Sequence, residues 1–183
     1  DRWIIVSVNR DITQRLAAQA QLELLLAAVD AAPDAIAVVD PDTFQYVHVN
    51  DAVCRLHGLP LQEVMKRGML GMFPQFTPQL LRQRYDDLIA MAPQAVSEER
   101  VVRRPDGSTI LTEAVRRAAR VGDRWLVISV ARDITQRKAE QTRLNMLKAA
   151  IDLAPDSFYL IDPEKLEYVE VNRAAGSLYG LTR

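Results

Sequence analysis

Two short apolar runs stand near the beginning of residues 34–132. They cover residues 35–39 and 44–49, and the turn-forming sequence Asp40-Pro41-Asp42 separates them. Runs of this length around such a turn predict two antiparallel strands joined as a hairpin. Asn50 follows directly and is suited to cap a helix over residues 51–57.

Helical spacing replaces the short runs in the middle of this stretch. Residues 60–76 contain several glycines and prolines, which predicts short, irregular elements. Between Pro78 and Pro93, apolar residues recur at spacings of three and four, which predicts a helix with one buried face. These apolar residues are Leu81, Tyr85, Leu88, Ile89 and Ala92.

Three further strands are predicted at the end of this stretch. Residues 96–103 and 109–119 are joined by the turn 104–108, and Gly122-Asp123 leads into residues 125–131. Two leading strands alone could not bury their apolar sides. We therefore expect an α+β fold in which five strands form one antiparallel sheet with helices packed on one face.

The sequence repeats itself at an offset of 122 residues: residues 2–61 align without a gap to residues 124–183, and about half of the positions are identical. A period this long corresponds to a whole domain. The repeat predicts a division into residues 1–10, the last strand of a preceding unit; 11–33, a connector helix; 34–132, a complete unit; 133–155, a second connector helix; and 156–183, the beginning of a following unit.

Both connectors carry an apolar stripe with the spacing of a coiled-coil seam. It consists of Leu22, Leu25 and Val29 in the first connector and of Leu144, Leu147 and Ile151 in the second. The stripe either packs on its own domain or pairs two copies in a parallel dimer. We favour the dimer because a long helix held only at its ends has apolar surface to cover. Asp11 and Asp133 are the expected N-caps, and Pro33 and Pro155 are expected to end the helices.

Composition excludes several classes of protein. The 183 residues are 49% hydrophobic and 26% charged, which is typical of a folded protein and not of a disordered or collagen-like chain. Lysine and arginine total 23 against 24 acidic residues, so no overall field attracts nucleic acid or an anionic membrane. No apolar run reaches the length of a membrane span, and the first residues do not form a signal peptide. We expect a cytoplasmic segment of a longer polypeptide, which is compatible with a membrane anchor elsewhere.

Residues suited to catalysis or metal binding are sparse. Cys54 is the one cysteine, and it shares a short predicted helix with His57. Two ligands are too few for an ordinary zinc site, so we interpret both as core residues and expect no metal. His48 is expected on the solvent face of a strand, with no role. The glycines form no phosphate-binding pattern, and the turn aspartates form no catalytic pair. We do not expect an enzyme.

Seven arginines crowd the last three predicted strands, where a nucleic-acid surface is one interpretation. They are Arg100, Arg103, Arg104, Arg116, Arg117, Arg120 and Arg124. Glutamates interleave with them and aromatic residues are nearly absent, whereas nucleic-acid surfaces combine basic and aromatic side chains. We therefore predict that all seven belong to a solvated face of the sheet and that the chain binds no nucleic acid.

These motifs together resemble tandem PAS domains, the sensory modules of bacterial signalling proteins. The most specific motif is Arg132-Asp133-Ile134-Thr135, repeated as Arg10-Asp11-Ile12-Thr13, which is similar to the Asp-Ile-Thr motif joining a PAS core to its output helix. The other matching residues are Pro33-Asp34, Asp40, Val49-Asn50, Leu56, Gly58 and the hairpin 104–108.

The resemblance implies a five-stranded antiparallel sheet whose last strand lies beside the first. The strand predicted at residues 3–9 and the pair at 157–171 then lack their own sheets. We expect both to be poorly ordered or to pair with another molecule, since an unpaired strand edge invites pairing.

The resemblance also implies a function. The expected role is a sensory and dimerisation module of a multidomain transducer of the histidine kinase or diguanylate cyclase/phosphodiesterase type. Its partners are a second copy and the neighbouring PAS and output domains, without membrane contact by this segment. The residues expected to couple core and helix are Asp133, Ile134 and Thr135, with Asp11 and Thr13 in the other copy. The alternatives are a ligand-free structural spacer and a flavin-dependent redox sensor.

PAS domains that bind covalent flavin or heme use particular residues for it, and each can be looked for in this sequence. Residues 68–78 contain no cysteine and Cys54 comes too early, so no covalent flavin is expected. Residues 80–91 contain no histidine, so no heme is expected. A noncovalent flavin or a small organic ligand stays open, although we favour a core filled by its own side chains and no cofactor. The candidate cavity residues are Met65, Met69, Met72, Phe73, Leu81, Tyr85 and Leu88.

Overall fold

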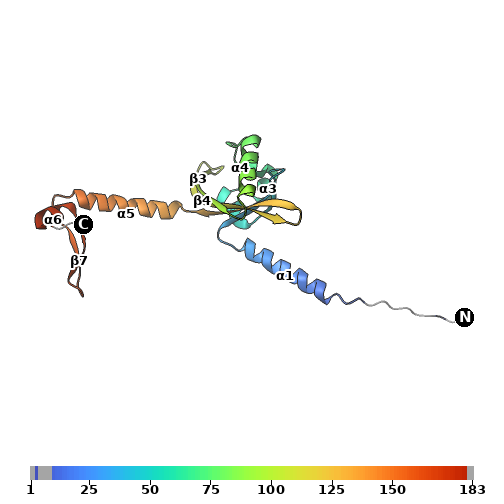
Figure 1. The fold of residues 1–183 in the computed structure, drawn as a ribbon, viewed down its shortest axis with the longest axis horizontal. Coiled ribbons are helices and arrows are strands. Elements are labelled where there is room, and N and C mark those ends of the chain that lie inside the picture. The colour runs from blue at the N-terminus through green and yellow to red at the C-terminus, as the bar shows by residue number, and fades with distance from the viewer. Residues whose placement is uncertain (1–2, 4–9, 181–183) are drawn as a thin grey trace. The chain divides into compact units, whose positions relative to one another are not determined.

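The computed structural model describes residue 3 and residues 10–180. The chain divides into two compact units, Asp1–Asp133 and Ile134–Arg183, which are described separately (Figure 1). The strand predicted at residues 3–9 lies outside the described residues, apart from Trp3.

The first unit contains one five-stranded antiparallel sheet. Its strands are β1 (Ala35–Val39), β2 (Tyr46–Val49), β3 (Ala95–Arg103), β4 (Thr109–Val121) and β5 (Arg124–Asp133). They lie in the order β2-β1-β5-β4-β3, with Ala35 of β1 opposite Ala131 of β5. The last strand thus lies beside the first, in the middle of the sheet, and the expected fold is confirmed.

Three helices stand between β2 and β3 in the sequence and pack against the sheet. They are α2 (Asp51–His57), α3 (Leu61–Met72) and α4 (Pro78–Ala90). Figure 1 shows α3 and α4 on the same side of the sheet. The cap of α2 is the predicted Asn50, and α4 begins where the Thr77 hydroxyl accepts the backbone N–H of Leu80 at 3.2 Å. Val39, Val64 and Val127 are fully buried in the core between these layers.

Residues 60–76 are more regular than the sequence predicts. A helix covers most of this stretch, and it is interrupted at Gly68, where φ is 57° and ψ is −172°. A β-carbon at Gly68 would lie 2.7 Å from the side-chain oxygen of Gln45. The prediction of short elements agrees with these two helical pieces, whereas the prediction of irregular ones was wrong because the chain is helical on both sides of Gly68.

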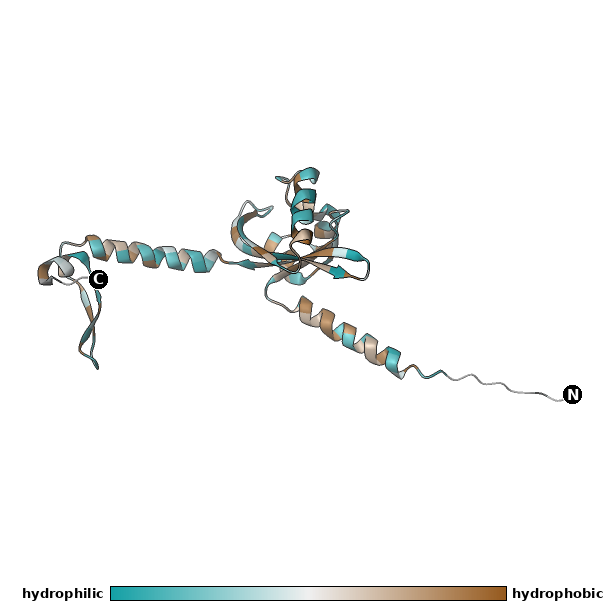
Figure 2. Cartoon of the chain, in the orientation of Figure 1, coloured by the Kyte–Doolittle hydropathy of each residue, from teal (hydrophilic) through white to brown (hydrophobic). Residues whose placement is uncertain are grey.

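The two predicted connector helices are present as α1 (Thr13–Asp30) in the first unit and α5 (Thr135–Leu153) in the second. Neither helix contains a buried residue. Figure 2 shows apolar residues distributed along both helices, interspersed with polar ones. Among the described residues, no helix is both long and apolar enough to cross a membrane.

The second unit continues from α5 into a hairpin and a short helix. The hairpin consists of β6 (Tyr159–Asp162) and β7 (Glu167–Val171), followed by α6 (Arg173–Tyr179). The two strands pair with each other, so the hairpin itself is formed. Its pairing with another molecule, the other half of the expectation, stays a prediction. Within the described part of the chain no further strand pairs with this hairpin, and its apolar side chains remain exposed, with Leu160 60% and Val169 67% exposed.

Candidate ligand-binding site and output junction

A small cavity lies between the sheet and the helices of the first unit. Its volume is about 40 Å³, and all five strands and helices α2, α3 and α4 contribute to its wall. Of the seven predicted cavity residues, Met69, Phe73 and Tyr85 line it. A space of this size holds about one water molecule.

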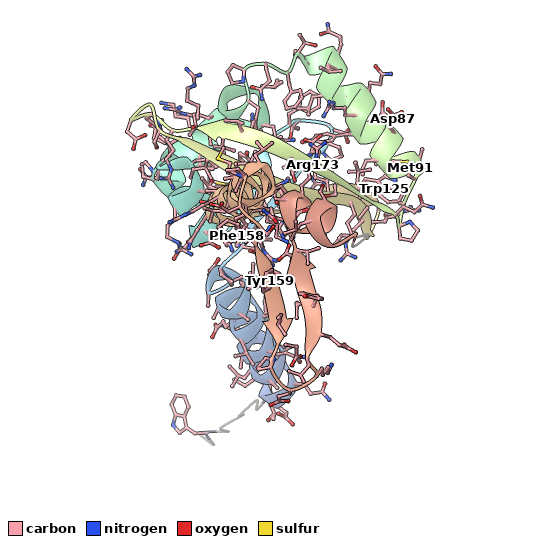
Figure 3. All side chains as sticks on the ribbon, turned by 90° about the vertical axis from the view of Figure 1, so that its left-hand side faces the viewer. Asp87, Met91, Trp125, Phe158, Tyr159 and Arg173 are labelled. Atoms are coloured by element: carbon pink, nitrogen blue, oxygen red, sulfur yellow. The ribbon has the colours of Figure 1, made fainter. Side chains whose placement is uncertain are left out.

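A larger groove of about 300 Å³ lies between α4 and strands β3 and β4. Four of the predicted residues line it, namely Met69, Leu81, Tyr85 and Leu88. Asp87 and Met91 at the end of α4, both labelled in Figure 3, complete its α4 side. Met65 and Met72 line neither space and pack against the core instead.

Arg100 and Arg116 line both spaces, together with Met69 and Tyr85. Their side chains are only 14% and 12% exposed, so the prediction that they belong to a solvated face was wrong. The reason is the two-residue period of a strand. Arg100 lies on the face of β3 that carries the buried Val102, and Arg116 lies on the face of β4 that carries the buried Ala114 and Ala118.

One carboxylate serves both buried arginines. Glu98 Oε1 accepts hydrogen bonds from Arg100 and, at 2.6 Å, from Arg116, and Glu98 Oε2 accepts one from Arg84 of α4 at 3.2 Å. Burial alone would raise the pKa of Glu98, but the two buried arginines outweigh it and lower the pKa to about 2. Burial and the neighbouring charge of Arg100 lower the pKa of Arg116. Positive charge therefore exceeds negative charge at this site.

Aromatic and imidazole groups complete the wall of the cavity. The guanidinium carbon of Arg100 lies 4.8 Å from the centre of the Phe73 ring, a cation–π contact. Tyr46 and Tyr85 are 6% and 3% exposed, and burial raises the pKa of both hydroxyls, that of Tyr85 to about 12. Both therefore remain protonated at neutral pH and are available as hydrogen-bond donors.

The interpretation of His57 as a core residue agrees with its position. It is 7% exposed and packs edge-on against Phe73, with ring centres 5.6 Å apart. Burial and the charges of Arg100 and Arg104 lower the pKa of His57 to about 4, so the imidazole is neutral at pH 7. Cys54 is a free thiol, and burial raises its pKa.

The junction between β5 and α5 differs from the predicted capping arrangement. Ile134, not Asp133, occupies the N-cap position, because Asp133 is still the last residue of β5 and pairs with Thr112. Ile12 takes the same place before α1, and the Asp11 carboxylate accepts the backbone N–H of Thr13 at 2.9 Å. Asp11 therefore binds the first turn of α1 from one position before the cap.

Two residues of the family motifs pair across the first unit. Arg132 Nε donates to Asp34 Oδ1 at 2.9 Å and its terminal nitrogen donates to Asp34 Oδ2 at 2.7 Å. The hydrogen bond from Arg132 lowers the pKa of Asp34. This bidentate pair connects the end of β5 to the residue before β1. Both residues belong to motifs that are visible in the sequence, but their pairing was not predicted.

Asn50 does more than cap α2. Its Oδ1 accepts the backbone N–H groups of Val53 and Ile36, and its Nδ2 donates to the carbonyl oxygens of Asp34 and of Val29, the latter in the last turn of α1. The side chain is 1% exposed. Asn172 makes the same four bonds in the second unit, including one to Ile151 of α5. This asparagine holds the end of a connector helix to the unit that follows it.

His48 also lies close to the end of α1. Its Nε2 is 3.6 Å from Asp30 Oδ1, and the side chain is 33% exposed. His48 was expected on the solvent face of its strand, and its side chain is partly exposed because the end of the helix lies close to it.

Residues 29–139, more than half of the chain, match the family model described as "PAS fold". The chain belongs to the PAS family. Residues 145–183 match a second model, described as "PAS domain". No curated protein sequence matches the chain.

Solved PAS structures are similar to this chain. The PAS domain of an HTR-like protein from Haloarcula marismortui is 21% identical with a TM-score of 0.59, covering 66% of this chain and 98% of that one. A domain of a sensory box sensor histidine kinase/response regulator from Geobacter sulfurreducens is 20% identical with a TM-score of 0.52, covering 63% and 96%. An RNA-binding light-oxygen-voltage receptor is 23% identical with a TM-score of 0.56, covering 79% and 41%. At these identities the likeness concerns the fold.

Proposed function

We propose that this chain is the sensory and dimerisation segment of a multidomain signal transducer and has no catalysis of its own. The complete PAS core responds to the stimulus, and residues 133–135 pass the response to α5. The catalytic output is of the histidine kinase or diguanylate cyclase/phosphodiesterase type and belongs to another part of the polypeptide. The similarity to a domain of a sensor histidine kinase from Geobacter sulfurreducens supports this class of output.

The observation that carries the proposal is the course of β5. Val127, Ser129 and Ala131 of this strand line the core cavity, and α5 begins two residues after the strand ends. Ile134, the single residue between them, is 1% exposed. A shift of β5 caused by a change in the cavity therefore moves the first turn of α5 with little slack, which is the small displacement that biases two-state switches.

The apolar stripes of the connector helices support a dimer. Leu22 and Leu25 are both 58% exposed, and Leu144, Leu147 and Ile151 are 54%, 52% and 45% exposed, while Val29 is half-buried. The alternative that each stripe packs on its own domain leaves this exposure unexplained. We infer that a second copy covers the stripes in a parallel arrangement, as in a coiled coil.

The dimer is tested by light scattering of the purified chain. We expect a dimer at micromolar concentration and a monomer after Leu144→Glu with Leu147→Glu, because two charges then lie in the seam. The matched control is Thr142→Glu with Ala149→Glu, two positions on the opposite face of the same helix, which should stay dimeric. A monomeric wild type, or equal effects of both pairs, contradicts the seam.

Coupling through the junction is tested in the parent transducer. Asp133→Ala and Thr135→Ala should change its basal output, because both act where the strand becomes the helix. Asp123→Ala is the matched control, since Asp123 is fully exposed at the other end of β5. Junction variants with the output of the wild type would refute the coupling.

The flavin-dependent alternative has less support. A cavity of about 40 Å³ has no room for a three-ring flavin system unless the core rearranges. The absorbance spectrum of the freshly purified chain distinguishes a protein without flavin from a flavin-dependent redox sensor. We expect no visible band, whereas a flavin spectrum would favour the redox sensor.

A further inference from the structure

The buried end of the groove carries an excess of positive charge. Arg100 and Arg116 are nearly buried and share Glu98 as their one carboxylate partner among the described residues. Arg84 adds a third positive charge from α4, and the exposed Asp87 at the end of that helix adds one negative charge. Burying a charge is costly unless an opposite charge accompanies it. The two buried arginines are thus matched by one negative charge, and a second anion would balance them.

The same place has more hydrogen-bond donors than acceptors. Each guanidinium carries five N–H donors, and within the described part of the chain Arg100 and Arg116 each direct one hydrogen bond, to Glu98. Tyr46 and Tyr85 also line the cavity, and their protonated hydroxyls are further donors there. An ionised carboxylate only accepts hydrogen bonds. Water molecules can also satisfy donors, but they add no negative charge.

The remainder of the groove is apolar apart from the exposed Asp87. Leu81, Leu88 and Met91 from α4 face Val96 of β3 across it, and Phe76 lies beside the Arg100 guanidinium. At about 300 Å³ the groove is at the lower end of the range for small-molecule sites. A ligand that fills it therefore combines one anionic end with a compact apolar body.

We propose that this site binds a small organic monocarboxylate, with its carboxylate on Arg100 and Arg116 and its apolar body against Leu81, Leu88 and Met91. The proposal names the ligand class of the sensory function proposed above and rests on it. Arg116 stands opposite Ser129 of β5, so a ligand held by this arginine acts on the strand that leads to α5.

The binding is tested by calorimetry of the purified chain with 3-phenylpropanoate and octanoate, each compared with its neutral amide. These probes have about ten non-hydrogen atoms, which suits a site of this size. We expect both acids to bind about ten- to a hundredfold more tightly than their amides, the usual contribution of hydrogen bonds to a charged group. Equal affinities of acid and amide, or no binding of either acid, would overturn the proposal.

Two variants with opposite effects separate recognition from structural support. Arg116→Gln should weaken acid binding about tenfold or more, and Glu98→Gln should strengthen it, because the internal competitor for the arginines is gone. Arg103→Gln and Arg117→Gln are the matched controls, since both arginines are exposed on the same two strands. Circular dichroism checks that each variant is folded.

If Arg116→Gln does not fold, the affinity of Glu98→Gln for 3-phenylpropanoate tests the proposal by itself. Tighter binding of 3-phenylpropanoate to Glu98→Gln supports the proposal, and unchanged or weaker binding overturns it. This assay measures binding without any signalling output. Its failure therefore leaves the junction test of the proposed function standing, and failure of the junction test leaves the binding result standing.

Discussion

Asn50 offers a quantitative test of how the connector helix is held to the PAS core. Asn50→Ala removes four hydrogen bonds at a site that is 1% exposed. The N–H groups of Ile36 and Val53 and the carbonyl groups of Val29 and Asp34 then lose this partner. At about 1 kcal/mol for each bond, the free energy of unfolding should fall by about 4 kcal/mol.

Asn50→Asp separates the two hydrogen bonds that the side chain accepts from the two that it donates. The carboxylate still accepts from Ile36 and Val53 and remains a good helix cap. It can no longer donate to the carbonyl oxygens of Val29 and Asp34 and repels them instead. We therefore expect α2 to remain stable while amide hydrogen exchange increases around the end of α1.

The assay is urea denaturation of the full chain, followed by circular dichroism. Asn172→Ala is the matched control, because Asn172 makes the same bonds in the second unit and should leave unfolding of the first unit unchanged. A loss below about 1 kcal/mol for Asn50→Ala, or equal losses for both variants, would show that Asn50 does not hold α1 to the core in this way.

Two further changes act on the core. His57 has a pKa of about 4 in the folded state and about 6.5 in the unfolded state, so the unfolded chain takes up the proton first as the pH falls. Between pH 8 and pH 5 the protein should lose about 2 kcal/mol of stability in urea titrations, and His57→Gln should lose less over the same range. Gly68→Ala should cost about 1–3 kcal/mol in thermal unfolding, because its φ of 57° with ψ of −172° suits only glycine; an unchanged melting temperature would show that the backbone adapts there.

Much of the fold follows from local signals in the sequence. The predicted strand at 35–39 and the helix at 51–57 have the bounds seen in the structure, because a turn and a capping asparagine mark their ends. The predicted order of strands and helices is also correct, since each hairpin is marked by its own turn residues. Residues 60–76 were predicted to be irregular because of their several glycines and prolines, but within α3 only Gly68 interrupts the helical geometry.

The candidate site was harder to predict. Arginines were counted as surface residues by their charge, although Arg100 and Arg116 alternate in phase with buried neighbours on their strands. The alternation of buried and exposed positions could be predicted from the sequence. The ion pairs with Glu98, which offset the cost of burying the two arginines, could not. Glu98 meets Arg116 only because β3 and β4 pair in one particular register.

The output junction also depends on contacts that the sequence does not reveal. Asp133 was expected to cap α5, but the sheet continues through it and moves the cap to Ile134. The link from Asn50 to Val29 likewise depends on how α1 meets the core. The same link recurs between Asn172 and Ile151 in the second unit. The sequence repeat shows only that these residues align with Asn50 and Val29, not that they are hydrogen-bonded.

The central claim is that a change in the PAS core alters the pairing of α5 in a dimer. Spin labels at Thr142→Cys, in a Cys54→Ala background, allow the distance between the two copies to be measured by double electron–electron resonance. We expect a distance distribution that shifts when 3-phenylpropanoate saturates its site in the PAS core. A distribution that stays the same while calorimetry shows the ligand bound would contradict it.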